Sequence, residues 1–177
     1  NKEYLFIKKH KPWGIILFQR NIKNIHQTKK LTSSIKNIFK DPNYPILIDE
    51  EGGTVSRLKE IVDNSIFSGK YFGELYKKNK KKFNLYYKVY IDQISYVLNL
   101  IGANINTVPV LDLRRNFSHK IISDRTYSNN KKVINKIGNL CINLFHQNRI
   151  GTVIKHIPGH GLAKQDSHFY LPYINNK

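Results

Sequence analysis

Four short apolar runs recur along the chain, at residues 14–18 (GIILF), 45–48 (PILI), 107–111 (TVPVL) and 152–154 (TVI). Because successive side chains of each run are apolar, both faces of the segment are hydrophobic, which is typical of buried parallel strands. Three longer stretches, at residues 25–39, 83–100 and 133–145, repeat apolar residues at helical spacing. The alternation of strands and helices predicts a parallel α/β architecture.

Polar or charged residues follow every apolar run. An open doubly wound sheet and a (β/α)8 barrel both fit the alternation, but the glycine-rich fingerprint of dinucleotide-binding sheets is missing after the first run. Polar clusters after all four strands favour the barrel, whose functional residues lie at the carboxyl ends of the strands. A complete barrel needs about 250 residues, so the 177 residues predict a partial TIM barrel forming one domain over 1–177.

The ends and the composition give weaker signals. No apolar run is long enough to cross a membrane, and no signal peptide is visible. Because the chain begins with Asn1 and lacks methionine, we expect an upstream piece to be missing. Cys141 is the single cysteine, and its apolar neighbours predict burial, which fits a reducing compartment.

The formal charge of +18 suggests nucleic-acid binding as one hypothesis. The alternative is the codon bias of an AT-rich genome, because lysine, isoleucine and asparagine abound whereas arginine, the preferred reader of bases and phosphates, is scarce. The lysine-rich run at residues 77–82 opens a predicted helix and is interpreted as a solvated face. We therefore expect no nucleic-acid partner.

Residues 155–172 (KHIPGHGLAKQDSHFYLP) concentrate the candidate chemistry. Pro158, Gly159 and Gly161 oppose a helix and predict a shaped loop after the fourth strand. The loop carries one lysine, one carboxylate and three histidines: Lys155, Asp166, His156, His160 and His168.

A zinc site is one interpretation of this loop, because three histidines and Asp166 could supply four ligands. Two histidines four residues apart share a face only on a helix, however, and Pro158 with Gly159 opposes one there. We expect neither a metal nor a cofactor.

Six segments, in order, resemble the motifs of glycoside hydrolase family 3 in its bacterial β-N-acetylglucosaminidase branch. They are GIILFQRN (14–21), DEEGGTVSR (49–57), VPVLD (108–112), SDRTY (123–127), KHIPGHG (155–161) and DSHFYLP (166–172). The resemblance implies a (β/α)8 barrel of which this chain supplies about the second to the fifth strand. It also implies a retaining cytoplasmic enzyme that removes terminal β-N-acetylglucosamine from peptidoglycan fragments, monomeric when full length and without a membrane partner.

The resemblance implies that His168 is the catalytic acid/base and that Asp166 orients it. Imidazole titrates near neutral pH, and a carboxylate can fix its tautomer and stabilise the imidazolium, so the pairing is chemically coherent. The alternative is that Asp166 caps the following turn and that His168 is an ordinary surface residue.

The resemblance assigns sugar contacts to Asp49, Arg57, Arg125, Lys155 and His156. Asp49 could instead cap a turn made by Gly52 and Gly53, and Arg125 could instead be tied to its neighbour Asp124. His160 is expected to shape the glycine-rich loop and not to contact the sugar.

The sequence departs from the family pattern at three positions: Glu50 replaces the usual glutamine, Thr54 an arginine and Ser123 a glycine. Glu50 adds a second carboxylate beside Asp49. The family nucleophile, an aspartate of a later strand, is not in this chain, so the 177 residues alone are expected to be inactive. Alternatives are another family-3 β-glycosidase, such as a β-glucosidase, and a basic non-catalytic module that binds sugar or nucleic acid.

Overall fold

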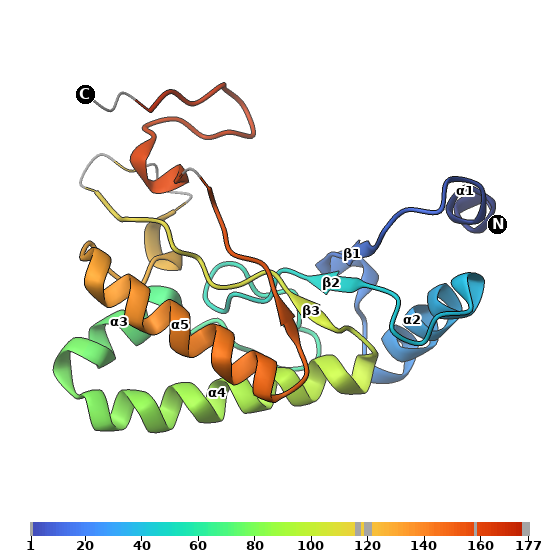
Figure 1. Ribbon diagram of the computed structural model, residues 1–177, viewed down its shortest axis with the longest axis horizontal. Helices are drawn as coiled ribbons and strands as arrows, with labels where there is room; N and C mark the ends of the chain where they lie inside the picture. Colours follow the sequence, from blue (N-terminus) through green and yellow to red (C-terminus); the bar gives the residue numbers. More distant parts are fainter. Residues whose placement is uncertain (1, 116–117, 119–121, 158, 175–177) are drawn as a thin grey trace.

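The computed structural model describes residues 2–115, 118, 122–157 and 159–174, so Pro158 lies outside the described residues. Four strands form one parallel sheet in the order β1-β2-β3-β4 (Figure 1). They are β1 (Ile15–Leu17), β2 (Ile46–Ile48), β3 (Ile105–Asn106) and β4 (Gly151–Thr152). Sequential order with parallel pairing means that every connection crosses over the sheet, as in a β/α barrel.

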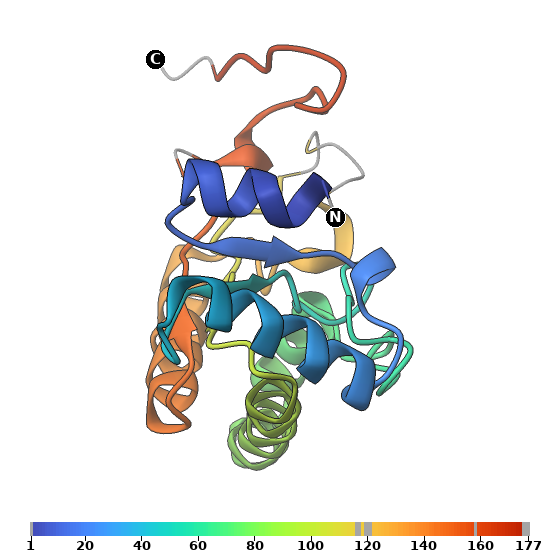
Figure 2. The same cartoon turned by 90° about the vertical axis from the view of Figure 1, so that its right-hand side faces the viewer.

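Helices alternate with the strands along the chain, and the first helix, α1 (Lys2–His10), precedes β1. The others are α2 (Ile25–Phe39), α3 (Gly69–Lys78), α4 (Lys80–Ile101) and α5 (Lys131–Gln147), with 3-10 turns η1 (Gln19–Asn21), η2 (Ser123–Arg125) and η3 (His160–Leu162). Helices α2, α4 and α5 lie on one side of the sheet, whereas α1 lies on the other side beyond β1 (Figure 2). This arrangement confirms the predicted partial α/β barrel.

The predicted helices are all present, and α2 has the predicted bounds. The predicted strand at residues 107–111 is wrong, because the pairing at β3 ends at Asn106. Beyond it Pro109 has no N–H to donate, and only Val110 forms a further isolated bridge, with Lys155. Helices α1 and α3 are additional elements that the apolar pattern did not predict.

The prediction that residues 152–154 form a buried strand is also wrong. β4 covers only Gly151–Thr152, and the side chains that follow it are exposed, Val153 by 41% and Ile154 by 43%. β4 is the last strand in the sheet order, so no further described strand borders its outer edge.

Asparagine and serine side chains set the starts of four helices. Asn24, Ser68, Asn79 and Asn130 each accept a hydrogen bond from a backbone N–H of the first helical turn. Asn79 lies inside the lysine-rich run, so the run is divided between the end of α3 and the start of α4. The lysines of the run are exposed, which confirms the solvated face.

The core lies between the sheet and its helices. Ile46 and Ile48 of β2 are fully buried against α4, whose own buried side chains include Ile91, Ile94 and Leu98. The ring of Phe72 of α3 packs against other aromatic rings, including those of Phe67, Phe83, Tyr87 and Tyr90. Cys141 of α5 is buried, as predicted.

Two glycines let α3 pack directly against the backbone that carries η2. An added Cβ at Gly69 would lie 2.2 Å from the carbonyl oxygen of Arg125, and one at Gly73 would lie 1.6 Å from that of Tyr127. Neither distance leaves room for a methyl group. The close approach therefore fixes the position of Arg125.

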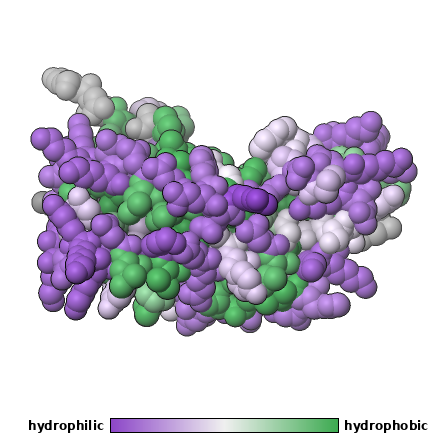
Figure 3. Space-filling model, turned by 60° about the horizontal axis from the view of Figure 1, so that its bottom comes forward, coloured by the Kyte–Doolittle hydropathy of each residue, from purple (hydrophilic) through white to green (hydrophobic). Residues whose placement is uncertain are grey.

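The surface is largely hydrophilic, with hydrophobic patches between polar side chains (Figure 3). Leu85 and Val89 of α4 are among the exposed apolar residues. Within the part of the chain that the structure describes, no helix is long and apolar enough to cross a membrane.

We expect Gly73→Ala to lower the free energy of unfolding by about 2 kcal/mol or more, because the new methyl group must push α3 away from residue 127. Urea unfolding of the 177-residue chain measures the loss. Lys77→Ala, at an exposed position of the same helix, is the control. Equal stability of the two variants would show that the contact is not tight.

Candidate active site

Lys155 joins the carboxyl ends of three strands. Its Nζ lies 2.6 Å from Glu51 Oε1 and 2.9 Å from Asp49 Oδ1, both of which follow β2. It also donates to Thr107 Oγ1, after β3, at 3.0 Å, and Thr107 donates in turn to Asp49. The side chain of Lys155 is mostly buried, so these contacts replace the water that would otherwise solvate its charge.

A glycine turn brings Arg57 back to the same place. Gly52 and Gly53 have φ values of +76° and +61°, which favour glycine, and the chain reverses so that Glu51 N–H donates to the carbonyl of Val55. Arg57 Nη2 then lies 4.0 Å from Asp49 Oδ2, and its guanidinium lies over the ring of Phe18, after β1.

Arg125 is held by Glu51 in a bidentate pair. Its Nε and Nη2 each lie 2.8 Å from one oxygen of the carboxylate, and both side chains are almost completely buried. Glu51 therefore binds Arg125 and Lys155 together. Asp124, the alternative partner considered for Arg125, accepts a hydrogen bond from Thr54.

His156 connects this pair to Asp112. Its Nε2 lies 3.2 Å from Arg125 Nη2, and its Nδ1 lies 2.6 Å from Asp112 Oδ2. Because a guanidinium can only donate, Nε2 must accept, so the proton is on Nδ1 and is donated to the carboxylate. Asp112 also accepts the backbone N–H groups of His156 and Gly161, which fixes the loop after β4.

We define the cluster as Asp49, Glu51, Arg57, Thr107, Asp112, Arg125, Lys155 and His156. Two of its carboxylates, Asp49 and Asp112, have lowered pKa values. Burial opposes ionisation of Asp49, but the hydrogen bond from Thr107 and the charge of Lys155 outweigh it and hold the pKa of Asp49 below its usual value. Burial likewise opposes ionisation of Asp112, and His156 and the N–H of Gly161 lower its pKa. Burial disfavours the charge of Arg125, yet Glu51 raises its pKa overall.

The structure therefore places all five residues predicted to bind sugar, which are Asp49, Arg57, Arg125, Lys155 and His156, in one cluster. Asp49 does not cap the glycine turn. Glu50 does so instead, because its Oε2 accepts the backbone N–H groups of Arg57 and Leu58. The second carboxylate expected beside Asp49 thus points away from the cluster, into the core.

His168 and Asp166 form a separate pair. His168 Nδ1 lies 2.7 Å from Asp166 Oδ1, and the same oxygen accepts the backbone N–H of His168, so Asp166 both caps the turn and holds the ring. The His168 side chain is 69% exposed. Among the described residues, no hydrogen bond or ion pair joins His168 to the cluster.

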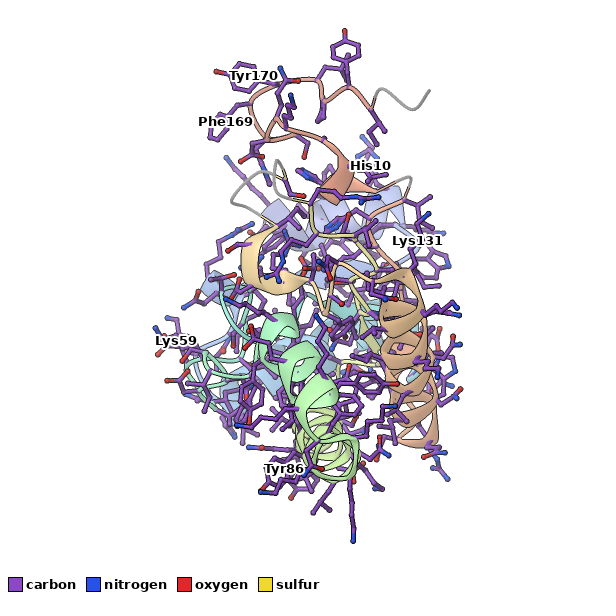
Figure 4. The ribbon with its side chains drawn as sticks, turned by 90° about the vertical axis from the view of Figure 1, so that its left-hand side faces the viewer. His10, Lys59, Tyr86, Lys131, Phe169 and Tyr170 are labelled. Carbon is purple, nitrogen blue, oxygen red and sulfur yellow. The ribbon has the colours of Figure 1, made fainter. Side chains whose placement is uncertain are left out.

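The segment that carries this pair projects beyond the sheet on the side away from α4 and α5 (Figure 1). Phe169 and Tyr170 are exposed on it and point outward at that end of the molecule (Figure 4). His156 lines a pocket of about 220 Å³ between the cluster and this segment, together with His160, Pro172 and Ile174.

His160 begins the 3-10 turn η3 and contacts Ser167 through Nε2 at 3.1 Å, as expected of a residue that shapes the loop. Within the described residues, no group of three or more His, Cys, Asp or Glu side chains is placed to hold a metal ion.

Sequence reasoning missed Glu51, Thr107 and Asp112. Glu51 and Asp112 belong to motifs that were recognised, but their partners are 74 and 44 residues distant. The spacing of Asp49 and Glu51 was an available signal, because alternate residues of an extended segment point the same way. By the same alternation, the side chain of Glu50 points to the opposite side from those of Asp49 and Glu51.

The chain is similar to known proteins along its whole length. The family model "Glycosyl hydrolase family 3 N terminal domain" matches residues 1–177. A β-hexosaminidase A from Pseudoalteromonas piscicida is 30% identical over 92% of this chain and 27% of its own length, and a β-hexosaminidase from Thioalkalivibrio sulfidiphilus is 30% identical over 90% and 45%. The chain therefore spans half or less of the curated relatives that it matches.

Native NagZ from Neisseria gonorrhoeae has a similar structure, with a TM-score of 0.79 and 28% identity over 90% of this chain and 46% of its own. The same NagZ has also been solved in complex with N-trifluoroacetyl-D-glucosamine, and that structure gives a TM-score of 0.78 at 26% identity over 97% and 50% of the two chains. The chain belongs to glycosyl hydrolase family 3, and the resemblance in its motifs is confirmed.

We expect Glu51→Gln to lower the free energy of unfolding of the 177-residue chain by about 3 kcal/mol at pH 7, because it leaves the buried charges of Arg125 and Lys155 without their shared carboxylate. Urea unfolding measures the change. Glu74→Gln removes an exposed carboxylate that pairs with Lys70 and should cost less than about 1 kcal/mol. If both variants lose the same small amount, Glu51 is not the electrostatic centre of the cluster.

Proposed function

We propose that the chain forms the sugar-binding part of a retaining β-N-acetylglucosaminidase, which removes terminal non-reducing N-acetylglucosamine from peptidoglycan fragments. The observation that carries the proposal is the cluster of Asp49, Arg57, Arg125, Lys155 and His156 at the carboxyl ends of parallel strands. The names of its relatives support it, as does the binding of a glucosamine derivative by NagZ from N. gonorrhoeae.

The cluster supplies hydrogen-bond acceptors and donors for the hydroxyl groups of a pyranose ring. Asp49 Oδ2 lies on the Arg57 side of its carboxylate and accepts hydrogen bonds from hydroxyl groups, while Arg57 donates to their oxygens. Lys155 donates to a hydroxyl oxygen in exchange for its hydrogen bond to Thr107. Because Asp49 and Asp112 have lowered pKa values, both stay ionised at neutral pH. The fixed pairs hold the donors in place before the sugar arrives, which reduces the cost of ordering them.

His168 is the proposed acid/base. With Nδ1 donating to Asp166, its Nε2 is left to exchange a proton with the glycosidic oxygen and then with water. This role requires His168 to reach the glycosidic bond of a sugar bound at the cluster. By the resemblance to the family, the nucleophile of the retaining mechanism is an aspartate of a later strand, which is proposed to lie outside this chain.

The proposed substrate is a muropeptide fragment, in which the sugar that follows N-acetylglucosamine carries a peptide. The proposed compartment is the cytoplasm, where such fragments are recycled. Both rest on the resemblance to the family branch. The proposed single domain over residues 1–177 and the monomeric state of the complete polypeptide have the same basis.

The test is hydrolysis of p-nitrophenyl N-acetyl-β-glucosaminide by the polypeptide from the complete reading frame of the gene. We expect activity, and we expect His168→Ala to lower kcat/KM by about 10²- to 10⁴-fold because the leaving oxygen loses its proton donor. His26→Ala, at an exposed histidine of α2, should leave kcat/KM unchanged.

Activity that survives His168→Ala would contradict the assignment of the acid/base. No hydrolysis by well-folded protein would contradict the proposed function and favour a binding module. The 177-residue chain on its own should bind without turnover, and measurable retaining hydrolysis by it would contradict the proposed position of the nucleophile.

A further inference from the structure

Two buried polar atoms beneath the cluster have no hydrogen-bond partner within the described part of the chain. They are Glu50 Oε1 and the hydroxyl oxygen of Tyr90. Glu50 is 1% exposed, and both residues line one cavity of about 10 Å³ between the sheet, α3, α4 and α5. A cavity of that volume is close to what a single water molecule needs, and two polar partners are enough to hold one.

The other carboxyl oxygen of Glu50 holds the glycine turn. Oε2 accepts the N–H of Arg57 at 2.7 Å and that of Leu58 at 2.9 Å, and Ser56 Oγ lies at 3.3 Å. The backbone of Glu50 is itself fixed by the side chain of Asn106, which both donates to its carbonyl and accepts its N–H. The position of Arg57 therefore depends on Glu50.

No cation contacts Glu50 within the described residues. Lys155 and Arg125 of the cluster form ion pairs with Glu51, whose side chain points to the opposite side of the chain from that of Glu50. The titratable groups around the cavity are Glu51, Tyr87 and Tyr90 of α4, Tyr127, and Cys141 of α5, and none of them carries a positive charge. Burial raises the pKa of Glu50 to about 7, against the lowering effect of the N–H groups of Leu58 and Arg57.

The tyrosines and the cysteine stay neutral in this layer. Burial raises the pKa of Tyr87, Tyr90 and Tyr127 well above the usual value and that of Cys141 to about 11. The Tyr90 hydroxyl can therefore donate or accept a hydrogen bond, but it cannot neutralise an ionised Glu50.

We propose that Glu50 acts in its protonated form as a positioning residue, whose Oε2 holds the turn that carries Arg57 and whose Oε1–H shares one buried water with Tyr90. Ionisation of Glu50 leaves a charge on Oε1 in a cavity without a cation, which destabilises the turn. The effect on sugar binding rests on the function proposed above for Arg57. The effect on folding does not.

Glu50→Gln tests the proposal, because the neutral amide reproduces the protonated carboxyl. In wild type the folded pKa exceeds the ordinary value of 4.5, so the stability that the proton contributes is present below about pH 4.5 and is lost as pH rises to about 7. The unfolding temperature of wild type should therefore fall relative to that of Glu50→Gln between pH 5 and pH 7, and the difference should level off above pH 8.

Glu60→Gln, at an exposed carboxylate after the turn, is the matched control and should run parallel to wild type over the whole pH range. Difference infrared spectra at pH 6 should contain a protonated carboxyl band that Glu50→Gln lacks. Parallel unfolding curves of wild type and Glu50→Gln, or the absence of that band, would overturn the proposal.

A second readout separates positioning from general stability. The assay uses the complete polypeptide with p-nitrophenyl N-acetyl-β-glucosaminide. KM of wild type should rise as pH increases from 6 to 8, whereas KM of Glu50→Gln should not rise with it. In both proteins kcat should change less than KM of wild type does. The same KM profile in both proteins would contradict the link to Arg57. If no variant hydrolyses the substrate, the proposed function fails, and the unfolding curves still decide the role of Glu50.

Discussion

The ammonium group of Lys155, set between Asp49 and Glu51, is the interaction on which the rest of the site depends. It ties the end of β4 to the end of β2 and, through Thr107, to the end of β3. A mostly buried lysine is costly unless it is paired and hydrogen-bonded, and this one has both kinds of partner. Because Glu51 also binds Arg125, a change at either carboxylate reaches several proposed sugar contacts.

The backbone around this interaction is shaped by glycine. Gly52 and Gly53 allow the turn that brings Arg57 back to Asp49. Gly69 and Gly73 allow α3 to approach the segment that carries Arg125. Both pairs of glycines fix a cation relative to a carboxylate. The first pair places Arg57 beside Asp49, and the second places Arg125 beside Glu51. Structural packing and the geometry of the site are therefore not separable here.

Sequence patterns predicted the architecture well because the strands are short continuous apolar runs, whereas the helices repeat apolar residues at helical spacing. The bounds of α2 followed directly from the helical spacing of its apolar residues. The strand ends were less predictable, since Pro109 interrupts pairing after Asn106 and the exposure of Val153 depends on what borders β4. Amphipathic periodicity was too weak in α1, which has no buried residue, to identify that helix.

For the site, motifs identified five of the eight residues of the cluster but not how the eight residues pair. Local sequence could not assign Glu51 to Arg125 or Asp112 to His156, because the fold brings these partners together from different strands. Glu50 was expected to change the charge beside Asp49, whereas the alternation of the extended chain directs it into the core. The His168–Asp166 pair was predictable because the two residues are neighbours on one turn.

The most direct test of the central claim is a crystal structure of the complete polypeptide with bound N-acetylglucosamine. The sugar should lie over the cluster, with hydroxyl oxygens within hydrogen-bonding distance of Asp49 Oδ2, Lys155 Nζ and the Arg57 guanidinium, and with the Glu51 pairs unchanged. A sugar bound at another surface while the cluster holds only solvent would contradict the claim that these strand ends form the sugar site.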